Sequence, residues 1–313
     1  MRFLNSPKPV VAIVGPTAVG KTELSLQLAM RLNGEIISAD SRLFYRGMDI
    51  GTAKPTGAEM ESVPHHLIDI ANPDETVGLA SFQEAAVRAI GDIQARGQLP
   101  FLVGGTGQYF WSVVEDWQIP VQEPDLRLRK ELERWAGEIG AEAIYNRLKY
   151  VDPPAAAHIE YRNVRRTVRA LEVIFRTGRR FSEQRKKGAS PFDWLIIGIT
   201  RPRNEVFARI DARIDEMLAE GFEAEVSRLL DQGYSEDLPS LSAIGYREMA
   251  TAVRGEIEIG EAAIKIKSQT HRFVRRQANW FKQDDPRIHW FRAGPGAADE
   301  IENYIRDAEV TKT

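Results

Sequence analysis

The chain has 313 residues, which suits one large domain or a core with a smaller second unit. It contains no cysteine, so disulfide bonds, thiolate metal ligands and thiol nucleophiles are excluded. It also lacks an apolar run of the ~18 residues that a membrane span needs, and its N-terminus lacks a signal-peptide core, so a cytoplasmic protein without membrane contact is predicted.

Five apolar segments are predicted to be strands: 10–14, 35–38, 101–103, 195–199 and 288–291. The first, third and fourth are continuously apolar, as expected of a parallel sheet buried on both faces. Helical patterns lie between and after them, at 23–32, 79–96, 204–220, 223–230 and about 260–282. This order predicts an α/β fold with a parallel sheet flanked by helices.

The segment between the third and fourth strands is too long for a simple crossover, and its pattern is helical throughout. Helices are predicted from Pro124, over 143–148 and over 164–175. We therefore expect an all-helical insertion domain. The expected boundaries are 1–120 for the first part of the core, 121–190 for the insertion and 191–313 for the second part of the core.

The first strand leads into a sequence of the form G-x-x-x-x-G-K-[ST], which is typical of a phosphate-binding loop (P-loop). Its residues are Gly15, Pro16, Thr17, Ala18, Val19, Gly20, Lys21 and Thr22. A strand before the loop and a helix after it aim backbone N–H groups and a helix N-terminus at a polyphosphate. Lys21 adds a positive charge, and the hydroxyl of Thr22 is placed to bind Mg²⁺. The core is thus predicted to resemble P-loop NTPases and to bind phosphate or pyrophosphate.

Two further strand ends carry polar residues near this loop. Asp40 follows the second strand, as either a Mg²⁺ ligand or a general base, because the carboxyl ends of parallel strands face the ligand crevice. The third strand ends in a glycine-rich sequence that contains Thr106. No acid of the Walker-B type ends the third or fourth strand, which argues against an ATPase or GTPase.

The net charge of −3 conceals two basic segments. Residues 162–187 contain ten Lys or Arg and two Glu, and residues 265–282 contain six Lys or Arg and no acid. In the first segment, arginines at helical spacing line one face: Arg162, Arg165, Arg166, Arg169, Arg176 and Arg180. In the second, one side of the predicted helix carries Lys265, Arg272, Arg275, Arg276 and Lys282. Because acids are so scarce, contact with nucleic-acid phosphates is favoured over a solvated face.

Together these segments resemble one family, the tRNA dimethylallyltransferases, along nearly the whole chain. The matching blocks are GPTAVGKT at 15–22, SADS at 38–41, YRGMDIGTAKP at 45–55, PHHLID at 64–69, LVGGTGQYF at 102–110, RALEV at 169–173, GFEAEV at 221–226, IGYREM at 244–249 and RRQANWF at 275–281. The resemblance implies transfer of a dimethylallyl group from dimethylallyl pyrophosphate to N6 of the adenosine 3′-adjacent to the anticodon, in tRNAs reading codons that begin with U. It also implies a monomer that uses Mg²⁺.

The resemblance further implies roles for individual residues. Asp40 is the expected general base and Thr106 contacts the reacting site, while Lys21, Thr22 with Mg²⁺, and Arg213 stabilise the departing pyrophosphate. The implied contacts with the tRNA anticodon stem-loop are Asp40, Ser41, Arg42, Leu43, Thr106, Arg127, Arg165, Arg166, Thr167, Val168, Arg169, Ser242, Ala243, Ile244, Gly245, Tyr246, Arg247, Arg275, Arg276, Gln277, Trp280 and Lys282. Leu43 stands where many members have a glutamine that reads the adenine, so other groups must read the base here.

Three other functions share part of this pattern. An adenylate isopentenyltransferase acting on free AMP, ADP or ATP has the loop and the aspartate, but does not need the basic insertion. A P-loop small-molecule kinase binds ATP in the same loop. A non-catalytic RNA-binding protein is disfavoured by the intact Lys21, Thr22, Asp40 and Thr106.

Overall fold

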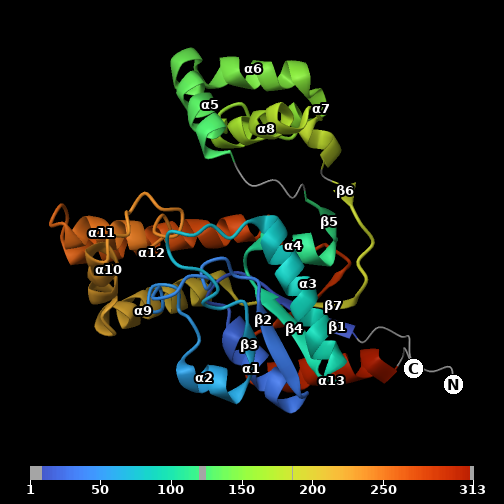
Figure 1. Ribbon diagram of the computed structural model, residues 1–313. Coiled ribbons are helices and arrows are strands. Elements are labelled where there is room, and N and C mark those ends of the chain that lie inside the picture. Colours follow the sequence, from blue (N-terminus) through green and yellow to red (C-terminus); the bar gives the residue numbers. More distant parts are fainter. Residues whose placement is uncertain (1–8, 120–124, 185, 311–313) are drawn as a thin grey trace. The chain divides into compact units, whose positions relative to one another are not determined.

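The computed structural model describes residues 9–119, 125–184 and 186–310 (Figure 1). The chain divides into a core unit, Met1–Val114 with Ser190–Thr313, and an insertion unit, Glu115–Ala189. The sequence-based interpretation places the insertion at 121–190, and the predicted helix start at Pro124 lies outside the described residues.

A six-stranded parallel sheet forms the centre of the core unit, with the strand order β3-β2-β4-β1-β7-β8. The strands are β1 (Pro9–Val14), β2 (Gly34–Ser38), β3 (His65–His66), β4 (Leu99–Gly104), β7 (Asp193–Thr200) and β8 (Ile288–Arg292). The central strand β1 has β-branched residues on both faces, and its residues 10–14 are fully buried. The predicted α/β class and all five predicted strands are therefore confirmed.

Helices pack around this sheet. Those of the core are α1 (Lys21–Arg31), α2 (Gly57–Ser62), α3 (Leu79–Ala95), α4 (Gly107–Val114), α9 (Arg203–Ala219), α10 (Phe222–Asp231), α11 (Tyr246–Val253), α12 (Ile259–Gln277) and α13 (Ala297–Val310). The crossovers through α1 and α3 move along the sheet in opposite directions. Because such crossovers are right-handed, the two helices cover opposite faces of the sheet.

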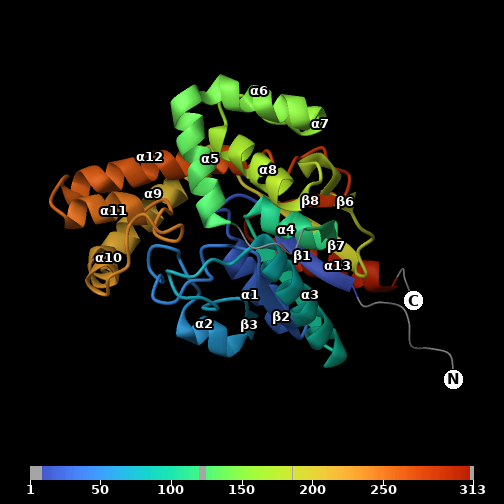
Figure 2. The same cartoon turned by 45° about the horizontal axis from the view of Figure 1, so that its top comes forward.

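The helices α9, α10, α11 and α12 pack against one another as a group beside the sheet (Figure 1, Figure 2). The helix α12 ends at Gln277, and residues 278–280 form a turn in which the N–H of Trp280 donates to the carbonyl of Gln277. The prediction of a helix to residue 282 was therefore wrong at its end. As a consequence, Lys282 does not share a helical face with Arg275.

The insertion unit has a core of its own. It contains α5 (Leu126–Ile139), α6 (Ala141–Val151), α7 (Pro153–Ala156), α8 (Val164–Thr177) and the 3₁₀ helix η1 (Phe181–Gln184), with a short antiparallel pair, β5 (Trp117–Gln118) and β6 (Lys186–Lys187). Apolar residues of its helices, among them Leu132, Ile144, Leu148 and Leu171, pack together and are buried. Since these buried residues pack against one another within the unit, the insertion is a small helical domain with its own hydrophobic core. In the described part of the chain, no helix is long and apolar enough to cross a membrane.

Candidate active site and nucleic-acid interface

The core unit contains a cavity of about 460 Å³ at the carboxyl ends of β1, β2 and β4. Its walls come from the P-loop, the residues after β2, a loop at 50–56 and the helix α9. This volume lies within the usual range for small-molecule sites. The carboxyl edge of the sheet is where the sequence predicted the ligand to bind.

The backbone of the P-loop adopts a conformation that its glycines permit. Gly15 has a φ of 146°, and a Cβ on it would lie 2.5 Å from the carbonyl oxygen of Ile199. Gly20 precedes α1 with a φ of 105°, and Ala18 is also left-handed, with a φ of 62°. Among the described residues, the N–H groups of Ala18, Val19 and Gly20 have no hydrogen-bond acceptor. Free N–H groups at a helix N-terminus suit an anionic ligand.

The carbonyl groups of the P-loop are held by cationic side chains. Nζ of Lys21 donates to the carbonyl of Pro16 at 2.8 Å, and Nε of Arg209 donates to that of Ala18 at 2.9 Å. Nε of Arg201 lies 3.4 Å from the carbonyl of Val19. These contacts fix the loop's oxygen atoms and bring positive charge to its edge.

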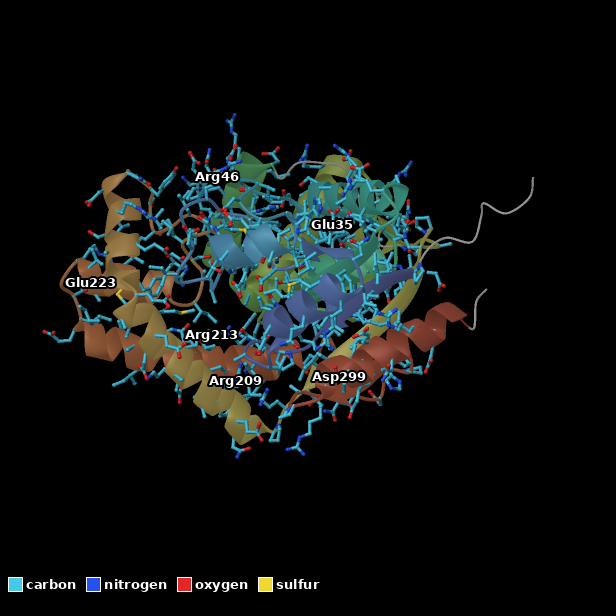
Figure 3. All side chains as sticks on the ribbon, turned by 90° about the horizontal axis from the view of Figure 1, so that it is seen from below. Glu35, Arg46, Arg209, Arg213, Glu223 and Asp299 are labelled. Carbon is cyan, nitrogen blue, oxygen red and sulfur yellow. The ribbon has the colours of Figure 1, made fainter. Side chains whose placement is uncertain are left out.

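Two cations in this cavity are desolvated. Burial lowers the pKa of Lys21 to about 8, an effect that the nearby Asp40 opposes and Arg213 adds to. Burial also lowers the pKa of Arg213, and the neighbouring Arg209 lowers it further. Arg209 and Arg213 lie one turn apart on α9 (Figure 3), and Arg213 has no ion-pair partner in the described part of the chain. Such a group of cations is stabilised by a bound anion.

Asp40 lines the same cavity. Its Oδ1 accepts a hydrogen bond from the backbone N–H of Arg42 at 3.0 Å, which closes a turn after β2. Within the described residues, its second oxygen accepts no hydrogen bond and is available to a substrate proton. The guanidinium of Arg42 donates to the carbonyls of Pro239 and Ser240, which commits this side chain within the protein.

Thr106 immediately precedes α4 and is not part of the cavity wall, whereas Gly104 is. This threonine stands beside Gly105, whose carbonyl accepts a hydrogen bond of 3.0 Å from the side-chain amide of Gln277. The oxygen of the same amide accepts one of 2.9 Å from the N–H of Thr17. Gln277 therefore joins the end of α12 to the P-loop and to the turn before Thr106.

Few side chains of the cavity could bind a metal ion directly. Thr22 is exposed and lines the cavity, and its hydroxyl has no hydrogen-bond partner among the described residues. No group of three or more His, Asp or Glu side chains suited to a metal ion occurs in the ranges that the structure describes. One hydroxyl, with Asp40 nearby, fits Mg²⁺, which commonly takes most of its ligands from substrate phosphates and water.

The residues expected to contact tRNA differ in exposure. In the core unit, Arg247, Arg275, Arg276, Trp280 and Lys282 are exposed, and Ser242 is half-buried. By contrast, Tyr246 and Gln277 are buried and hydrogen-bonded inside the core, and Ala243 is buried. These buried side chains contact other residues of the core, and their expected contact with tRNA stays a prediction.

The basic helix α8 shows the same division. Arg165 and Arg166 are exposed and have no carboxylate partner among the described residues, and Arg127 on α5 is also exposed. Thr167 and Val168 are buried in the insertion unit, and their expected contact with tRNA stays a prediction. Arg169 lies 2.9 Å from the buried carboxylate of Glu172, which Arg129 also binds. The scarcity of acids predicted that these arginines have no ion-pair partner. Among the described residues this is correct for Arg165 and Arg166 and wrong for Arg169.

Sequence reasoning missed Arg201 and Arg209, which hold the P-loop. Arg209 is four residues before Arg213 in a predicted helix, so the spacing alone predicts that both arginines lie on the same helical face. It also missed Glu225, a buried carboxylate that binds the loop at 49–51. No sequence periodicity predicts that Glu225 binds this loop.

Comparisons with known proteins all match this chain to one protein family. The family model of IPP transferases matches residues 43–284. A tRNA dimethylallyltransferase of Roseiflexus sp. (strain RS-1) is 54% identical over 275 residues, which cover 88% of this chain and 90% of that protein. One of Thermomicrobium roseum is 47% identical over 92% of this chain and 87% of that protein.

Solved structures agree with these matches. The tRNA isopentenylpyrophosphate transferase of Bacillus halodurans has a TM-score of 0.72 and 42% identity, and the match covers 98% of each chain. A eukaryotic dimethylallyltransferase acting on tRNA has a TM-score of 0.82 and 26% identity, over 97% of this chain and 80% of that one. The predicted P-loop-like fold and the predicted family are thus confirmed. The chain belongs to the tRNA dimethylallyltransferase family, enzymes that transfer a dimethylallyl group to tRNA.

Proposed function

We propose that the chain transfers the dimethylallyl group of dimethylallyl pyrophosphate to N6 of the adenosine 3′-adjacent to the anticodon, in tRNAs reading codons that begin with U. One observation carries the proposal: a single cavity is lined by the P-loop cations and by apolar side chains. Its apolar lining includes Leu43, Ile50, Pro55 and Met217. Such a cavity suits a ligand with an anionic head and a short hydrocarbon tail.

The head of this donor is assigned to the P-loop and α9. The free N–H groups of residues 18–20 and the cations Lys21, Arg209 and Arg213 receive the pyrophosphate. Their charge matters most as the bond from C1 to oxygen breaks, because the leaving oxygen then gains negative charge. We assign Mg²⁺ to the hydroxyl of Thr22, where the ion supplies further neutralisation of that charge when it is bound.

The acceptor is assigned to the side of Asp40. The N6 amine is a weak nucleophile, since its lone pair is delocalised into the purine ring. As the bond between N6 and C1 forms, one proton must leave N6, and the available oxygen of Asp40 accepts it. The pyrophosphate departs with the electron pair of the broken bond. Thr106 and the exposed Trp280 are assigned to the acceptor side.

A base in a folded stem-loop is stacked, so the adenosine must leave its stack to reach this cavity. The exposed arginines 165, 166, 247, 275 and 276 are assigned to the phosphates of the tRNA, which they bind without reading sequence. With Leu43 at the cavity wall, the adenine has no glutamine amide at that position to bind.

The test is direct incubation with Mg²⁺, dimethylallyl pyrophosphate and unmodified tRNA that reads codons beginning with U, followed by ribonuclease digestion and mass spectrometry of the fragments. An adenosine heavier by one isopentenyl group, found next to the anticodon, is expected. Parallel reactions replace tRNA with free AMP or omit Mg²⁺. Equal modification of AMP establishes an adenylate isopentenyltransferase instead, and ATP turnover with a small-molecule acceptor establishes a kinase. The proposal also takes the enzyme to be a cytoplasmic monomer, and sedimentation with and without tRNA tests the monomeric state.

A further inference from the structure

One wall of the cavity is a loop held from behind by a single carboxylate. Glu225, on α10, accepts hydrogen bonds from the N–H groups of Asp49 at 2.9 Å, Ile50 at 2.8 Å and Gly51 at 3.2 Å. The hydroxyl of Tyr246, the first residue of α11, donates to the same carboxylate at 2.6 Å. The loop at 47–56 is thus tied to two helices through one side chain.

This carboxylate is buried, with 5% of its surface exposed, and all four of its donors are neutral. Three successive N–H groups that converge on one anion form a strong anion site. Burial raises the pKa of Tyr246 well above its ordinary value, so the phenol stays a proton donor. Such charge-assisted hydrogen bonds are stronger than those between neutral groups.

The loop also fits closely onto the two helices. A Cβ at Gly51 would lie 2.1 Å from the ring of Phe222 and 2.7 Å from that of Tyr246, so any larger residue here would displace these rings. At the far end of the loop, Lys54 donates to the carbonyl of Tyr45 and to the carboxylates of Asp49 and Asp69. The loop is therefore held at its middle and at its end.

The same loop lines the cavity through residues 50 and 52–56. Among these, Ile50, Ala53 and Pro55 are apolar, and Ile50 is one of the three residues whose N–H group Glu225 binds. Among the described residues, the cavity cations without a carboxylate partner come from the P-loop and α9, whereas Lys54 of this loop is paired with Asp49 and Asp69. Hence Glu225 fixes part of the apolar lining that suits the hydrocarbon tail, whereas the unpaired cations that suit the anionic head lie on elements that it does not bind.

We propose that Glu225, together with Tyr246, is a positioning residue that shapes the site of the donor's five-carbon group by fixing the loop at 47–56. This inference rests on the proposed function and adds a prediction to it. Loss of the carboxylate must weaken binding of dimethylallyl pyrophosphate and leave binding of inorganic pyrophosphate nearly unchanged.

The test compares Glu225→Gln with Glu223→Gln by calorimetry, using dimethylallyl pyrophosphate and inorganic pyrophosphate, each with Mg²⁺. The amide keeps the size of the side chain but removes its charge and places an N–H group among donors. Glu223 is exposed on the same helix (Figure 3) and is a matched control. For Glu225→Gln, we expect the Kd of dimethylallyl pyrophosphate to rise about tenfold and that of pyrophosphate to rise less than about twofold. Hydrogen exchange at residues 49–51 must accelerate about tenfold or more.

Equal weakening of both ligands overturns the proposal, because Glu225 then supports the core as a whole. Unchanged binding of both overturns it as well. Should Glu225→Gln fail to fold, Tyr246→Phe removes one donor and keeps three, and about a threefold selective loss is expected; no loss overturns the proposal. A wild-type chain that binds pyrophosphate but not dimethylallyl pyrophosphate contradicts the proposed function itself, independently of any variant.

Discussion

Positive charge occurs in two settings in this protein, the cavity of the core unit and the surface of α8. In the cavity, Lys21 and Arg213 are partly buried, and desolvation lowers the pKa of each. On α8, Arg165 and Arg166 are exposed and lack carboxylate partners among the described residues. The first group lies in a cavity beside P-loop N–H groups that have no acceptor among the described residues, whereas the second lies on an exposed helical surface.

This difference indicates two kinds of electrostatic binding. Desolvated cations in a fixed arrangement favour one anion of defined size and stabilise charge that develops during a reaction. Exposed arginines favour any long polyanion, and their contribution falls with salt as counterions are released. Variants in the cavity should therefore change turnover, and variants on α8 should change tRNA affinity.

The largest effect is expected for Lys21→Met. The variant removes the charge at the P-loop while keeping most of the aliphatic side chain, so kcat should fall by about 10³-fold through loss of leaving-group stabilisation. The measurement is single-turnover prenyl transfer with saturating tRNA. A fall of less than about threefold would contradict the assignment of Lys21 to the pyrophosphate.

Asp40→Asn should reduce kcat by about 10²-fold and leave tRNA affinity unchanged. The amide oxygen can still accept the N–H of Arg42, so the turn after β2 is retained and the effect reports the lost base. Turnover and filter binding of tRNA are measured on the same preparation. Weaker tRNA binding with normal turnover would assign Asp40 to recognition instead.

Arg165→Ala combined with Arg166→Ala should weaken tRNA binding by about tenfold at low salt and reduce the salt slope of log K by about 2. Arg134→Ala is the control, because Arg134 is exposed in the same unit but paired with Glu131 and Glu138. Titrations over a range of salt concentrations give both quantities. If the double variant and the control behave alike, the basic face of α8 is only solvated.

The last prediction concerns pH. Because the pKa of Lys21 is about 8 in the folded chain and 10.5 for the unperturbed group, the folded chain loses this charge as the pH rises through 8. Pyrophosphate affinity should therefore decline above that pH by up to about tenfold per unit in the wild type, relative to Lys21→Met. The same shift means that charged Lys21 opposes folding at neutral pH, and that this cost disappears between about 8 and 10.5.

In the corresponding control, the free energy of unfolding of Lys21→Met at pH 7 should be no lower than that of the wild type. A lower value would show that the contact between Lys21 and Pro16 outweighs the cost of desolvation. Calorimetric titration of pyrophosphate into the wild type and into Lys21→Met, at pH values between 7 and 9.5, measures the predicted difference in the pH dependence of affinity.

The sheet was predictable because its strands are buried on both faces and so read as continuous apolar runs, as in β1 and β7. The P-loop was predictable because its backbone conformation demands glycine at fixed positions. The end of α12 was not, because Ala278 and Trp280 continue the helical pattern while the chain turns there.

The side chains that support the site were harder to predict. Glu225 and Gln277 act on backbone atoms far away in the sequence, Glu225 on residue 50 and Gln277 on residues 17 and 105. Nearly every residue has a backbone N–H and carbonyl group, so the partner of such a side chain has no characteristic residue type. Sequence spacing therefore does not reveal these pairs. Exposure on α8 was easier to predict, because the helical spacing of Arg165 and Arg166 already assigned them to one face.

The hydrogen bond between Lys21 and the carbonyl of Pro16 has a consequence for product release. In this structure the ammonium group already has an acceptor, supplied by the loop itself. In the proposed reaction, Lys21 returns to this carbonyl when pyrophosphate departs, so the ammonium group keeps an acceptor in a desolvated site. On this proposal the loop itself replaces the product, and the emptied loop is ready for the next donor.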